Sequence, residues 1–114
     1  MSLEQNQSQQ YREVPDKYVN PAESYQMKTY DYVVRPDSSQ GAITITLPPV
    51  AEAKGRWYSI VARAVGNDIT VADKDDSECW PGDITLNVKC QKLLLFSDGL
   101  TWYCFFGGAA SYNG

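Results

Sequence analysis

The side chains with the clearest chemical potential in this sequence are carboxylates. Two of Glu52, Glu78 and Asp98 could cleave a glycoside, one acting as general acid and the other as base or nucleophile. Asp98 stands before Gly99 between two apolar runs, however, and Asp-Gly in that position is typical of a tight turn. No feature of the sequence marks Glu52 or Glu78 as buried. The carboxylates therefore lend only weak support to a glycosidase.

Residues 73–78 place carboxylates at alternating positions, a spacing that can converge on a calcium ion. An EF-hand loop would need glycine at its sixth position and glutamate at its twelfth, where this chain has Glu78 and Ile84. We expect a solvated loop without a metal ion.

Histidine is absent, which excludes Ser-His-Asp and Cys-His nucleophile arrangements and zinc sites that use imidazole. The spacings of Cys79, Cys90 and Cys104 match no Cys-x-x-Cys metal or redox motif. We expect three reduced thiols, and a disulfide between Cys90 and Cys104 stays open. The sequence predicts neither an enzyme nor a cofactor.

The charge balance and the apolar runs exclude two kinds of partner. Ten Lys and Arg against fourteen Asp and Glu leave a net charge of −4, which argues against nucleic-acid binding because that affinity rests on clustered cations. No apolar run approaches the ~20 residues of a membrane span, so we expect no membrane partner. The N-terminal residues lack the basic start and apolar stretch of a signal peptide. We expect synthesis and retention in a cytoplasm.

Residues 1–30 are predicted to form an extended N-terminal arm. They are rich in glutamine and poor in branched aliphatic residues, and Pro15 and Pro21 disfavour a long helix. Tyr11, Tyr18 and Tyr25 recur every seven residues, without the second apolar position of a heptad. The segment is either a disordered tail or an arm that docks these tyrosines on a partner.

Residues 31–106 are predicted to form a β domain, and residues 107–114 a flexible tail. Short apolar runs, several of them alternating, are separated by turn signals, and none shows a helical period. The runs expected as strands are 29–34, 43–47, 56–65, 69–72, 84–88, 92–97 and 100–106. We predict an all-β fold, a small sandwich or barrel-like knob with an extended N-terminal arm.

The predicted domain has more large apolar residues than a core of its size needs. Some of them should face another chain, so we expect an oligomer. The candidates for the subunit interface or core are Trp57, Phe96, Trp102, Tyr103 and Phe105. Trp80, beside Pro81 in a polar loop, could instead stack on a sugar ring; the alternative is that it caps the end of the core.

Several short motifs occur in a fixed order over about residues 41–106. They are Thr46-Leu47-Pro48, the Gly55–Ile60 segment of the form G-x-x-Y-x-I, Ile69-Thr70-Val71, Gly82 with Thr85-Leu86, and the residues 97–103 of the form S-D-G-x-x-W-Y. This ordered set resembles a β module common in structural proteins of tailed bacteriophages. The spacing between Gly82 and Thr85 is shorter than in that module.

The resemblance implies a virion structural protein that forms a homotrimer and has no catalytic residues, with structural roles for Trp102 and Tyr103. A short arm on a compact knob suits a capsid decoration (cement) protein, located on the capsid surface of the virion. Its partner would be the major capsid protein, bound through arm residues Tyr11, Tyr18 and Tyr25. The alternative is a tail-fibre or receptor-binding tip that recognises host surface glycans.

Overall fold

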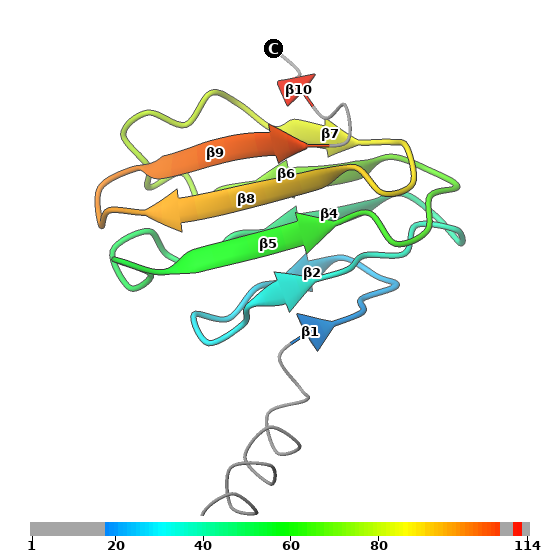
Figure 1. The fold of residues 1–114 in the computed structure, drawn as a ribbon, viewed down its shortest axis with the longest axis horizontal. Coiled ribbons are helices and arrows are strands. Elements are labelled where there is room, and N and C mark those ends of the chain that lie inside the picture. The colour runs from blue at the N-terminus through cyan, green and yellow to red at the C-terminus, as the bar shows by residue number, and fades with distance from the viewer. Residues whose placement is uncertain (1–17, 108–110, 113–114) are drawn as a thin grey trace, which may run out of the picture.

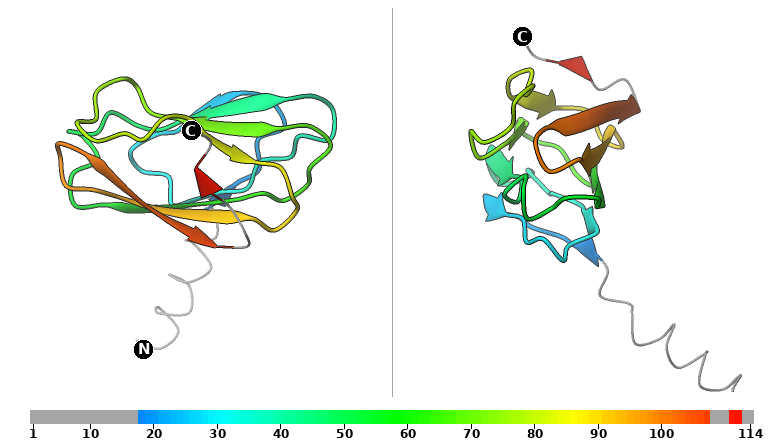
Figure 2. Two further views of the ribbon diagram at one scale, coloured as in Figure 1. Left: turned by 90° about the horizontal axis from the view of Figure 1, so that it is seen from above. Right: turned by 90° about the vertical axis from the view of Figure 1, so that its left-hand side faces the viewer.

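Two β-sheets stacked face to face form the described part of the chain, as Figures 1 and 2 show. The computed structural model describes residues 18–107 and 111–112. These residues form strands, turns and loops without a helix, so the predicted all-β class is confirmed. In that part of the chain, accordingly, there is no helix of the length and apolarity that crossing a membrane requires.

Each sheet has five strands. Sheet A contains, in spatial order, β1 (Tyr18–Val19), β3 (Val33–Val34), β5 (Trp57–Val61), β8 (Lys92–Ser97) and β9 (Trp102–Gly107). Sheet B contains β10 (Ser111–Tyr112), β7 (Ile84–Leu86), β6 (Ile69–Ala72), β4 (Ile43–Thr46) and β2 (Tyr25–Gln26).

The first six strands alternate between the two sheets. Within each sheet they pair in parallel: β1 with β3 and β3 with β5 in sheet A, and β2 with β4 and β4 with β6 in sheet B. The chain from residue 18 to residue 72 therefore winds as a flattened coil of three turns. From β7 onward all pairings are antiparallel.

The β8–β9 hairpin forms at the predicted Asp98-Gly99 turn. Gly99 has a φ of 96°, a conformation that favours glycine because it lacks a Cβ. The Asp98 carboxylate accepts hydrogen bonds from the backbone N–H groups of Leu100 (2.8 Å) and Thr101 (2.9 Å). The turn residues thus fix the hairpin register.

The core lies between the sheets and is built from alternate residues of each strand. Ile43 and Ile45 of β4 point inward while Thr44 and Thr46 point outward, which is the pattern expected of a sheet with one buried face. Trp102 is only 2% exposed and meets the ring of Tyr58 edge-on at 5.6 Å.

Residues 18–30 belong to this sandwich, which corrects the domain boundary predicted near residue 30. Met27 is 1% exposed and lies in the core. Tyr25 packs against the core and donates a hydrogen bond of 2.8 Å to the buried Asp31 carboxylate, which also accepts the backbone N–H of Lys28 (2.8 Å). The remainder of the predicted arm, residues 1–17, and most of the predicted tail lie outside the described residues.

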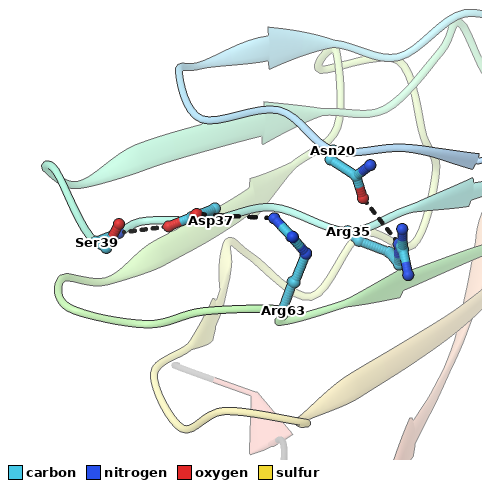
Figure 3. A network of polar contacts seen from close by, with 5 residues as sticks. All are labelled: Asn20, Arg35, Asp37, Ser39 and Arg63. Atoms are coloured by element: carbon cyan, nitrogen blue, oxygen red, sulfur yellow. Dashed lines mark hydrogen bonds and ion pairs between the residues drawn. The ribbon is translucent and has the colours of Figure 1, made fainter.

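Polar contacts link the turns of the coil at one end of the sandwich (Figure 3). The Arg35 guanidinium donates a hydrogen bond to the Asn20 side chain (2.8 Å), and Arg63 lies 3.9 Å from the Asp37 carboxylate. Asp37 also accepts the backbone N–H of Ser39 (2.9 Å). Hydrogen bonds from the side chain and the backbone of Ser39, together with the Arg63 charge, lower the pKa of Asp37.

Candidate functional site: the outer face of sheet A

Large apolar side chains gather on the outer face of sheet A. The strand register aligns Trp57, Phe96 and Tyr103 in one row across β5, β8 and β9. A second row crosses all five strands and includes Tyr18 of β1, Leu94 of β8 and Phe105 of β9. We call the aromatic face the six outward side chains Tyr18, Trp57, Leu94, Phe96, Tyr103 and Phe105. Five of them are 42–51% exposed, and Phe96 is partly buried among them.

Four rings of the aromatic face, those of strands β5, β8 and β9, contact one another. The Trp57 ring centroid lies 4.8 Å from that of Phe96 and 5.9 Å from that of Phe105, and Phe96 stacks on Tyr103 at 6.3 Å. Such offset and tilted pairs are favourable beyond the area that they bury. These four rings therefore form one continuous apolar surface.

A shallow hollow of about 310 Å³ opens on this face. It is lined by Ser59, Lys92, Leu93, Leu94, Phe105 and Phe106. Lys92 is the single charged side chain among the outward positions of the described sheet A strands.

The outer face of sheet B is chemically different. Its central row consists of Thr44, Thr70 and Thr85, paired across β4, β6 and β7. Thr46 and Ala72 form the next row. Hydroxyl groups at these positions suit a face that remains in water. The outer face of sheet B is therefore polar, whereas that of sheet A is apolar.

The structure separates the interface and core candidates into two groups. Trp57, Phe96, Tyr103 and Phe105 lie on the aromatic face, whereas Trp102 lies in the core. Sequence reasoning missed Leu94 as a member of the face. Its position two residues before Phe96 in a strand was the signal that could have found it, because residues i and i+2 share a face.

The three arm tyrosines do not form a row of anchors. Tyr18 lies on the aromatic face at the sheet edge, with the Arg35 guanidinium 4.0 Å from its ring centroid. Tyr25 lies in the other sheet, and burial together with Asp31 raises the pKa of its hydroxyl. Tyr11 lies outside the described residues.

The candidate catalytic carboxylates have structural or solvated positions. Glu52 and Glu78 are exposed. Asp98 is held by its turn and by the Tyr103 hydroxyl, which donates to it at 2.9 Å. The backbone hydrogen bonds from Leu100 and Thr101, and then that of Tyr103, lower the pKa of Asp98. A lowered pKa suits a turn carboxylate and not a general acid.

Replacement of Asp98 by Asn is expected to lower stability in a pH-dependent way. Because the folded-state pKa is lowered, the stabilisation by the charged carboxylate is fully present above the unfolded-state pKa of about 3.9. It is lost as the pH falls through the folded-state value. Urea midpoints of wild type and Asp98→Asn should therefore differ near pH 7 and converge in acid. A difference that is the same at every pH would contradict this role.

The described residues contain no group of three Cys, Asp or Glu side chains placed to hold a metal ion. One carboxylate of residues 73–78 instead has a structural contact. The Asp76 carboxylate accepts a hydrogen bond from the backbone N–H of Val50 at 3.1 Å. Trp80 is partly buried against the core, with its indole nitrogen enclosed, in the position that a residue capping the core would take.

The three cysteines are free thiols. Cys104 faces Leu95 across the β8–β9 hairpin, while Cys90 lies in the turn before β8 with a φ of 75°. The Cys90–Cys104 disulfide left open by the sequence is therefore absent from this structure.

Burial is expected to protect one thiol from alkylation. It raises the pKa of the Cys104 thiol to about 12, whereas Cys79 and Cys90 are exposed. Iodoacetamide at about pH 8 should therefore modify Cys79 and Cys90 in the native protein, and Cys104 only after unfolding. Peptide mass spectrometry over time measures the three rates, and equal rates in the native protein would contradict the burial of Cys104.

The functional residues that the fold brings together are thus those of the aromatic face, and their arrangement is suited to contact with another macromolecule. Comparison with family models, with curated proteins and with solved structures finds no match for this chain.

Proposed function

We propose that this protein is a structural protein of a tailed-bacteriophage virion, a capsid decoration protein that binds the shell as a trimer. The observation that carries the proposal is the position of the phage-like motifs within the fold. Their segments occupy neighbouring strands: β4 pairs with β6, β5 with β8, and β8 with β9. The ordered motifs therefore describe one folded unit.

The residues that define these motifs lie in the core or in a turn. Leu47 after β4, Tyr58 and Ile60 of β5, and Val71 of β6 are all buried. Asp98 and Gly99 form the hairpin turn. Because the motif residues maintain the fold, the function of such a module would lie in its outer surfaces. This is what we expect of a virion component.

The proposed capsid anchor is limited to residues 1–17 by the finding that residues 18–30 are part of the sandwich. The Tyr25 hydroxyl is hydrogen-bonded to Asp31, so this side chain is not free to enter a pocket on another protein. Three copies of an anchor on one trimer would bind with higher avidity than any single copy. The proposal therefore assigns capsid contact to the segment that precedes β1.

Co-sedimentation with capsids tests this function. The purified full chain should bind undecorated capsids of the phage whose genome encodes it, with saturable occupancy. Deleting residues 2–17, which keeps every described strand, should reduce occupancy at limiting protein concentration. Equal occupancy of the two proteins would exclude the segment as an anchor. Failure of the full chain to bind capsids, with binding to purified host glycans, would favour the fibre-tip alternative.

A further inference from the structure

We infer that the aromatic face is the surface through which copies of this chain contact one another. The inference deepens the assembly step of the proposed function by naming the surface and its occupant, a second copy of the same chain. Its physical basis is the composition and size of the face. This basis holds whether or not the protein belongs to a virion.

The exposed area of the face is large for a monomer of this size. Tyr18, Trp57, Tyr103 and Phe105 are each 47–51% exposed. An aromatic side chain presents roughly 150–250 Å² in full, so these four together expose roughly 400 Å² of mainly apolar surface. A stable interface uses about 800 Å² per partner, with a mainly apolar centre. The face supplies most of the apolar area that such a centre needs.

The charge distribution also fits contact between identical surfaces. The chain has a net charge of −4, yet the outward side chains of the described sheet A strands include no carboxylate. Lys92 lies at the margin, opposite the end of β9. The Asp98 carboxylate, which accepts the Tyr103 hydroxyl, lies at the opposite margin, in the β8–β9 turn. Copies of the face can therefore come together without placing a carboxylate at its centre, and charge depletion at the centre is characteristic of interfaces.

A second copy is a better occupant than the segment before β1. Residues 1–17 contain few apolar side chains, and most of the segment is glutamine and other polar residues. Such a segment cannot cover four half-exposed rings. Every copy, in contrast, carries an apolar face of the same extent. Trp57 and Tyr103 are also residue types that dominate the binding energy of interfaces, and their contacts with Phe96 hold both rings in place before association.

Sedimentation equilibrium of the full chain tests the inference with two face variants and one matched control. Leu94→Lys and Phe105→Lys place a cation in the centre of the face. Thr70→Lys makes the same change in charge on the outer face of sheet B, where Thr70 lies in the middle row. Wild type and Thr70→Lys should associate equally. Each face variant should raise the dissociation constant at least about thirtyfold.

Circular dichroism and thermal melting of dilute protein establish that each variant is folded. If a lysine variant does not fold, Phe105→Ser, which introduces no charge, replaces it in the comparison. A monomeric wild type, or an oligomer that all face variants retain, would overturn the inference. Capsid co-sedimentation of the face variants is measured separately. Loss of self-association with retained capsid binding would support the inference while removing the trimer from the proposed function.

Discussion

Deleting residues 2–28 is expected to unfold the protein. The deletion removes strands β1 and β2 together with Met27, which is 1% exposed in the core. Truncating a buried Met alone costs about 2–5 kcal/mol. The deletion also takes away Tyr25 and Lys28 N–H, leaving the buried Asp31 carboxylate without these donors. The combined loss is comparable with a total stability of about 5–15 kcal/mol, so far-UV circular dichroism and urea titration should show no cooperative transition.

Point substitutions test whether the loss of stability comes from the buried residues of the N-terminal segment or from any change within it. Met27→Ala should lower the free energy of unfolding by about 2–5 kcal/mol. Tyr30→Ala removes a larger side chain that is 72% exposed and should change stability by less than about 1 kcal/mol. A truncated chain that folds with an unchanged melting temperature would show that residues 18–28 are dispensable for the sandwich.

Replacing Ser38 by Ala is expected to cost about 2–3 kcal/mol, because one buried hydroxyl serves three backbone groups. Ser38 is fully buried. Its hydroxyl donates to the carbonyl oxygen of Asn67 (2.6 Å) and accepts from the backbone N–H groups of Gly66 and Asn67 (3.3 Å each). These bonds join two successive turns of the coil, and alanine would leave all three groups without this partner.

The melting temperature of Ser38→Ala should fall by on the order of 10 °C. The neighbouring Ser39 is exposed, and Ser39→Ala should cost less than about 1 kcal/mol. The close approach at this point also constrains Gly66, because a Cβ there would lie 3.1 Å from the Cα of Ser39. Equal melting temperatures of the two serine variants would contradict the role assigned to Ser38.

The sequence predicts best those elements whose local pattern matches their final environment. Ile43–Thr46 alternates in polarity and forms a strand with one buried face. Ile69–Ala72 and Lys92–Ser97 have the bounds expected from the sequence, and Asp98-Gly99 makes the expected turn. In each case a local pattern or turn signal was sufficient.

The missed elements depend on distant partners. β1 and β2 have two residues each and lie in a segment rich in polar residues. They are strands because Val33 and Ile45 offer parallel neighbours, and no local pattern predicts such pairing. The strand expected over residues 29–34 is shortened to Val33–Val34 because Asp31 closes a turn with Lys28.

The candidate interface could be predicted in part. The aromatic content indicated a surface for another chain, and four of the five predicted residues share one face. Residue parity within β9 places Trp102 opposite Tyr103 and Phe105, and applying it would have assigned Trp102 to the core. The inclusion of Tyr18 required the parallel pairing of β1 with β3, which only the fold reveals.

The mass of the purified full-length chain in solution tests the central claim, assembly through the aromatic face, most directly. Static light scattering over a series of micromolar concentrations should give a mass above that of one 12.8 kDa chain, three times that mass for the proposed trimer, decreasing toward one chain on dilution. A mass of 12.8 kDa at every concentration would contradict the account, because the aromatic face would then be exposed to water in a stable monomer.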